Sequence, residues 1–125
     1  MPTKKETLTA LHAAKEHWLR LKWASEVLDE AEVIAVPFRV KVLKKLIGES
    51  FYGYDCALCE LFLEGIDKDD GCNSCPIGIA GLTCGVFLSP WNKVIIATTW
   101  KETAVRSQEM VDMLCCLIAE WEEKK

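Results

Sequence analysis

No uninterrupted apolar stretch in this chain of 125 residues approaches the roughly 20 residues that a membrane-spanning helix needs. The first six residues run into a charged helical pattern and lack the apolar region of a secretory signal, so we expect a cytoplasmic protein without a membrane anchor. Positive charge is not in excess either. Fifteen Lys and Arg against nineteen Asp and Glu leave a net charge of −4, which disfavours binding to nucleic acid or anionic membranes.

The composition that remains is typical of a packed globular domain. Half of the residues are hydrophobic and 27% are charged, which argues against disorder. A length of 125 residues matches one domain, and no internal repeat or low-complexity linker divides the chain. We therefore expect a single domain over residues 1–125.

Helical periodicity is clearest at the two ends of the chain. Thr3 and Glu6 have the spacing of a capping box, and a helix is predicted from near Thr3 to around Glu30. Its mostly apolar stripe consists of Leu11, Ala14, Trp18, Leu21, Ser25 and Leu28. The opposite face, expected to be solvated, carries Lys15, Glu16, Arg20 and Lys22. His12 and His17 are five residues apart, so they do not share a face, and we interpret them as partly exposed polar residues rather than metal ligands.

The C-terminal helix begins with a second capping-box spacing, Thr99 to Glu102, and is predicted to extend for about 22 residues. Its stripe comprises Ala104, Ser107, Val111, Leu114, Ile118 and Trp121, widened by Met110 and Leu117. Cys115 and Cys116 fall within this pattern and are interpreted as small buried hydrophobic residues. Two such helices bury their stripes most simply against each other, although the C-terminal stripe would equally serve a homodimer.

A shorter element is predicted after Pro37, because a proline starts a helix more readily than it continues one. Helical spacing and a stop at Gly48 favour a helix here, while alternating apolar residues at 38, 40 and 42 leave a short strand open. The basic side chains of this stretch are Arg39, Lys41, Lys44 and Lys45. We expect them to form a solvated face, and a docking surface is the alternative.

Residues 51–98 differ from their surroundings by being rich in glycine and acidic side chains. Two lysines stand against six carboxylates, so this segment alone matches the net negative charge of the protein. Ala57–Gly65 reads as a short helix, and the apolar run Val94–Ala97 suits a helix or a strand.

Two C-x-x-C pairs in this segment predict a metal site. Twelve residues separate the first pair from the second, and four thiolates are the ligand set that tetrahedral zinc prefers. The pairs are Cys56 with Cys59 and Cys72 with Cys75. Cys84 follows nine residues later and is the candidate to replace one of the four. An iron–sulfur cluster is the rival interpretation, since four thiolates also suit it, but ferredoxins use denser cysteine runs.

The predicted zinc ion is structural rather than catalytic. Catalytic zinc keeps an open position beside ligands that usually include histidine or carboxylate, and no histidine lies between residues 18 and 125. The cysteines alone can fill all four positions, so the metal would fold a segment with a small apolar core. We therefore expect a non-enzymatic protein with a protein partner. A zinc-dependent regulator that binds nucleic acid is an alternative, disfavoured by the acidic segment.

The cysteine motif resembles that of a group of small bacteriophage-encoded, cysteine-rich proteins of unassigned function. Their pattern is C-[AP]-L-C, C-x-x-C-P-[IV], a glycine, a cysteine and [ST]-P-[YW], which residues 56–91 of this chain follow through Gly81, Cys84 and Ser89–Trp91. The chain departs from the group in the longer connection between Asp29 and Tyr54.

The resemblance implies a zinc-binding phage accessory protein that acts in the cytoplasm of a bacterial host cell, on a host or phage macromolecule, for example in host defence. It also implies that Cys84 belongs to the ligand pattern. The overall expectation is a mainly α fold in which two long terminal amphipathic helices pack around a small central zinc-stapled module, at about residues 51–91.

Overall fold

The computed structural model describes residues 2–32, 39–51, 57–63, 75–79 and 89–124 of the chain. These residues form helices and connections, and no strand occurs among them. The helices are α1 (Lys4–Glu30), α2 (Arg39–Ile47), α3 (Ala57–Leu63), α5 (Pro76–Ile79), α6 (Pro90–Ile96) and α7 (Trp100–Glu123). The predicted mainly α fold is therefore confirmed.

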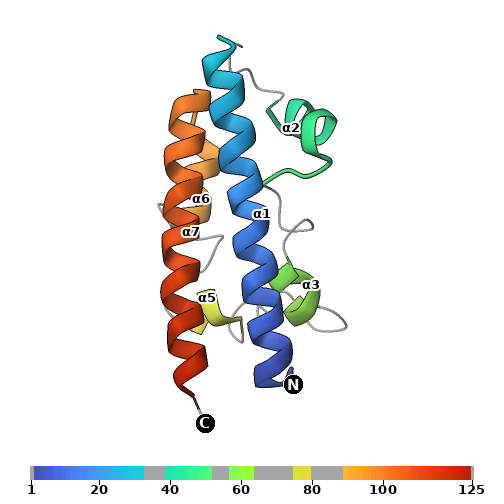
Figure 1. Ribbon diagram of the computed structural model, residues 1–125, viewed down its shortest axis with the longest axis vertical. Helices are drawn as coiled ribbons and strands as arrows, with labels where there is room; N and C mark the ends of the chain where they lie inside the picture. Colours follow the sequence, from blue (N-terminus) through green and yellow to red (C-terminus); the bar gives the residue numbers. More distant parts are fainter. Residues whose placement is uncertain (1, 33–38, 52–56, 64–74, 80–88, 125) are drawn as a thin grey trace.

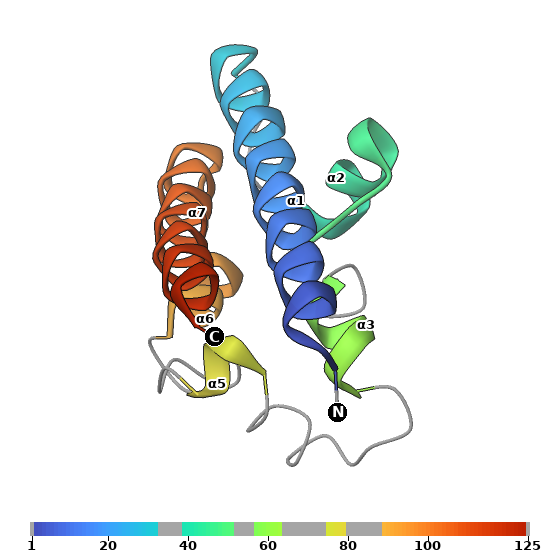
Figure 2. The ribbon, with the colours of Figure 1, turned by 60° about the horizontal axis from the view of Figure 1, so that its bottom comes forward.

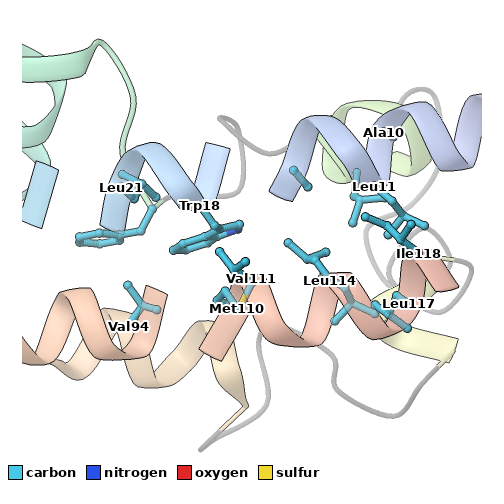
Figure 3. Packing of buried hydrophobic residues seen from close by; sticks show 14 of the residues in the cluster. Ala10, Leu11, Trp18, Leu21, Val94, Met110, Val111, Leu114, Leu117 and Ile118 are labelled. Atoms are coloured by element: carbon cyan, nitrogen blue, oxygen red, sulfur yellow. The ribbon is translucent and has the colours of Figure 1, made fainter. Parts of the chain in front are cut away.

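The two terminal helices lie side by side and run in opposite directions (Figure 1). Lys4 at the start of α1 donates a hydrogen bond from Nζ to the carbonyl of Glu122 at the end of α7, at 3.2 Å. Both predicted stripes face this interface. Leu11, Trp18 and Leu21 of α1 meet Val111, Leu114 and Ile118 of α7 in one continuous core (Figure 3). The C-terminal stripe is thus used within the chain.

The capping signals locate the helix starts correctly. Thr3 Oγ1 accepts from the Glu6 amide, and Glu6 Oε1 accepts from the Thr3 amide, so the capping box is complete. Thr99 Oγ1 likewise accepts from the Glu102 amide at the start of α7. Each cap satisfies an amide that has no partner within its own helix.

The short helices pack around the helix pair and complete the core with Leu43, Leu58, Ile77 and Val94. The run Val94–Ala97, ambiguous in the sequence, is helical through Ile96 in α6, which Ser89 caps ahead of Pro90. The stretch after Pro37 is also helical from Arg39. It stops at Gly48, whose φ of 75° lies in the left-handed region that glycine occupies without a steric penalty.

Arg39 is a correction to the predicted basic face of α2. Lys41 and Lys45 are exposed as expected, but Arg39 is buried. Its Nη1 donates to Val94 O (3.1 Å) and to Thr103 Oγ1 (3.0 Å), and its Nη2 donates to Ile95 O (2.6 Å). The guanidinium therefore caps the C-terminal carbonyls of α6 and joins α2, α6 and α7. Charge alone did not reveal this, because the partners lie more than 50 residues away in the sequence.

Cys115 and Cys116 are a second correction. Both are exposed, whereas the sequence pattern placed them in the core. The neighbouring core residues Leu114 and Leu117 define the side of α7 that faces α1. At 100° per residue, the two positions between them turn away from that side, so an apolar neighbourhood in sequence did not mean burial.

None of the helices in the described ranges is both long enough and apolar enough to cross a membrane.

Arg39→Met provides a test of the buried guanidinium. The substitution keeps an apolar stem but leaves two α6 carbonyls and Thr103 without this donor, so we expect a loss of about 2–4 kcal/mol in unfolding free energy. Urea unfolding monitored by circular dichroism measures it. The matched control is Lys41→Met on the exposed side of the same helix, with a change within about 0.5 kcal/mol. Equal effects of the two substitutions would contradict the capping role.

Candidate metal centre

The structure describes part of the predicted ligand set. The side chain of Cys75 is described, and Cys59 is placed as a backbone position in α3. Cys56, Cys72 and Cys84 lie outside the described residues. Among the side chains that are described, no three from His, Cys, Asp and Glu come together in a way that would hold a metal ion. The four-cysteine site therefore stays a prediction.

Cys75 occupies a defined place at the start of α5. Its side chain is half-buried and packs against the main core, and its carbonyl accepts from the Ile79 amide at 2.9 Å. The next two residues, Pro76 and Ile77, are buried. The second C-x-x-C pair thus ends at a backbone anchored by apolar packing, which suits a ligand that must not move.

The first C-x-x-C pair ends inside α3, and this helix is also anchored. Leu58 and Phe62 are buried and lie four residues apart, so they form one face, and α3 packs against α1. Cys59 directly follows Leu58. Figures 1 and 2 place α3 and α5 at the same end of the molecule, where both chain termini lie. Cys59 in α3 and Cys75 directly before α5, one residue from each cysteine pair, therefore lie at that end of the molecule.

The two borders of the predicted module are tied to each other. Trp91 Nε1 donates to the carbonyl of Phe51 at 2.6 Å, which joins positions 40 residues apart. The Phe51 ring is buried and lies 4.8 Å from the guanidinium carbon of Arg39, in cation–π geometry. Residues 51–91 therefore leave and rejoin the scaffold at one place, which closes the loop independently of any metal.

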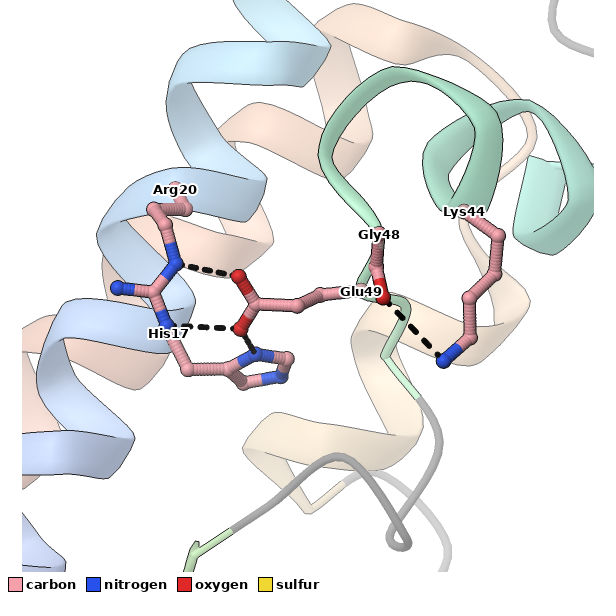
Figure 4. Close-up of polar contacts among 5 residues, drawn as sticks. All are labelled: His17, Arg20, Lys44, Gly48 and Glu49. Carbon is pink, nitrogen blue, oxygen red and sulfur yellow. Dashed lines mark hydrogen bonds and ion pairs between the residues drawn. The ribbon is translucent and has the colours of Figure 1, made fainter.

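A polar cluster next to this border was missed by the sequence analysis. His17, expected to be partly exposed, has a side chain that is only 3% exposed, and its Nδ1 lies 2.7 Å from Glu49 Oε1. Arg20 clamps the same carboxylate, with Nη2 2.7 Å from Oε1 and Nε bonded to Oε2 (Figure 4). His12, by contrast, is exposed as expected.

The sequence spacing of His17 and Arg20 could have predicted one part of this cluster. His17 and Arg20 are three residues apart and so share a side of α1. Their acceptor comes from 29 to 32 residues further along, after the turn at Gly48. Only the return of the chain against α1 brings Glu49 to them, and that return depends on tertiary packing.

The electrostatics of the cluster fix its hydrogen-bond directions. The hydrogen bonds from Arg20, and to a lesser degree from His17, hold the pKa of Glu49 below its ordinary value of 4.5. An ionised carboxylate only accepts, so His17 Nδ1 donates to it. His17 Nε2 is buried and has no hydrogen-bond partner. The cluster can therefore attach the segment after α2 to α1 by hydrogen bonds, just before the cysteine-rich region begins.

No protein-family model, curated protein or solved structure matches this chain.

Glu49 makes the stability of the fold dependent on pH. The pKa of Glu49 is lower in the folded protein than its ordinary value of 4.5. The contribution of the ionised carboxylate to the unfolding free energy is therefore present above about pH 4.5, and it is lost as the pH falls through the lower pKa of the folded protein. We expect Glu49→Gln to lower the unfolding free energy by about 1 kcal/mol at pH 7, with a difference from the unsubstituted protein that shrinks in acid.

Urea unfolding from pH 7 down to about pH 3 measures this difference across the titration of the carboxylate. Glu120→Gln, on the exposed side of α7, serves as the control and should change the unfolding free energy at pH 7 by less than about 0.5 kcal/mol. A Glu49→Gln effect that stays constant over this range would count against the ionised carboxylate as its source.

Proposed function

We propose that the chain is a non-enzymatic binding protein whose central segment, about residues 51–91, takes its shape from a structural zinc ion. The ligands are four cysteines out of Cys56, Cys59, Cys72, Cys75 and Cys84. The observation that supports this proposal is the anchoring of the segment. Trp91 donates a hydrogen bond to the carbonyl of Phe51 at 2.6 Å. Cys59 lies in α3, which buries Leu58 and Phe62, and Cys75 directly precedes the buried residues Pro76 and Ile77 of α5. A scaffold that holds both borders lowers the entropic cost of gathering four ligands.

The donor set fits a closed site. Thiolates at all four positions leave no place for a reactive water, and the metal then contributes folding free energy. Cys75 supplies one thiolate from a position already held by Pro76 and Ile77. The segment is acidic and rich in glycine, and four metal–thiolate bonds hold its loops together.

The zinc-stapled surface then serves as a binding face. The phage-type cysteine motif supports an accessory role on a host or phage macromolecule. A protein partner fits the charge of the segment better than nucleic acid, since residues 51–91 contain one lysine and six carboxylates, and this negative charge repels a phosphate backbone.

Zinc content of cysteine variants tests the ligand assignment. We expect about one zinc ion per chain in the purified protein by elemental analysis, and a clear loss in Cys59→Ser and in Cys75→Ser. Cys115→Ser is the matched control, since Cys115 is exposed on α7 and outside the module. Equal metal loss from all three variants, or iron with visible absorption in place of zinc, would overturn the proposal.

Chelation provides an independent test of the structural role. If the free energy of zinc binding stabilises the folded protein, removal of zinc by excess chelator should lower the melting temperature by several degrees. The Cys75→Ser protein should melt near the chelated value and respond little to chelator. A melting temperature that chelator leaves unchanged in zinc-loaded protein would show that the metal does not stabilise the fold.

A further inference from the structure

A groove runs along the helix pair at the end opposite the cysteine helices. It encloses about 450 Å³ between the C-terminal half of α1 and the N-terminal half of α7. These two halves lie together in the upper part of Figure 1. The groove is lined by Lys22, Glu26, Asp29, Glu30, Lys101, Ala104, Val105, Gln108 and Glu109.

The charge of the groove is negative and only partly compensated. Its lining holds four carboxylates and two lysines. Lys22 pairs with Glu26 at 3.5 Å, and Glu109 pairs with Arg106 at 2.8 Å. Asp29 and Glu30 form no ion pair with any described residue.

The uncompensated carboxylates also stand at an unfavourable place in the helix. Asp29 and Glu30 lie in the last turn of α1, which contains no basic residue. The C-terminal end of a helix carries partial negative charge and repels carboxylates, so both side chains cost stability where they are. Cations brought by a partner would remove this repulsion.

Large apolar side chains accompany the negative charge. Val105 lines the groove and is 52% exposed. Trp23 is 57% exposed and lies three residues before Glu26 and seven before Glu30, so the three share one side of α1 beside the groove. Exposed tryptophan is a typical anchor of protein interfaces.

We propose that this groove binds a helical segment of a partner protein that has an apolar stripe flanked by lysines or arginines. The stripe would cover Val105 and Trp23, and the basic residues would pair with Asp29 and Glu30. A nucleic acid would bring like charge to the groove, and a second copy of this chain has a net charge of −4. The choice of a protein as the partner rests on the proposed function. The geometry of the groove depends on α1 and α7 alone.

A designed peptide serves as the probe. It is a fluorescent helix of about 15 residues, with leucines at helical spacing along one face and lysines elsewhere. The comparison peptides are a scrambled sequence of the same composition and an analogue with glutamate in place of lysine. Fluorescence anisotropy with the full-length protein should show saturable binding of the lysine peptide alone, weakened by raising salt from about 0.05 to about 0.5 M.

Charge reversal locates the binding surface. Asp29→Lys with Glu30→Lys should weaken binding about tenfold, and Trp23→Ala should weaken it several-fold. The matched control reverses two exposed carboxylates near the other end of α7, Glu120→Lys with Glu123→Lys, and should change affinity less than about twofold. Circular dichroism confirms that each variant is folded.

The groove proposal is overturned if the scrambled peptide binds equally well, if the lysine peptide fails to bind, or if both double variants weaken binding alike. Zinc content is measured on the same protein samples. Zinc-loaded protein that ignores the peptide would refute the groove and leave the proposed metal role intact, whereas peptide binding by protein that holds no zinc would do the reverse.

Discussion

Burial of the apolar stripe of α1 against that of α7 supports every other part of this structure. The interface runs from Leu11 to Ala24 on α1 and contains Trp18 opposite Val111 (Figure 3). The other helices in the described part of the chain are between 4 and 9 residues long, too short to persist in water on their own. Each of them adds a few apolar side chains to a core that α1 and α7 have already formed. These short helices are therefore stabilised by packing against α1 and α7.

The second level of organisation is polar and connects distant segments. Arg39 caps α6, Glu49 receives hydrogen bonds from His17 and Arg20, and Trp91 bonds the backbone at Phe51. These contacts surround the point where the cysteine-rich segment leaves and rejoins the scaffold. A metal bound within that segment would therefore act on a loop whose ends are already held, while the groove beside Val105 lies at the other end of the helix pair. The proposed metal module and the proposed docking groove are thus separate surfaces of one scaffold.

Two physical causes explain where the burial of a residue differs from its sequence-based prediction. His17 and Arg39 were assigned to solvent because they are polar, yet both are buried with partners more than 30 residues away. Cys115 and Cys116 were assigned to the core because their neighbours are apolar, yet the helical turn points them outward. Burial of a polar group depends on whether a partner is present, and that partner is supplied by the tertiary fold. The cysteine pairs remain a sequence-based prediction, since spacing identifies the donor type and number without giving their positions.

Local sequence determined the elements whose energetics are local. The caps at Thr3 and Thr99, the stop at Gly48 and the two long stripes follow from hydrogen bonding and periodicity within a few residues, and the helix boundaries agree closely with them. Tertiary structure alone decided that the run before Ala97 is helical, that Arg39 reaches α6, and that the acidic end of α1 meets Val105 in a groove. Those features require segments far apart in the chain to meet, and their free energy arises only after the helix pair has packed.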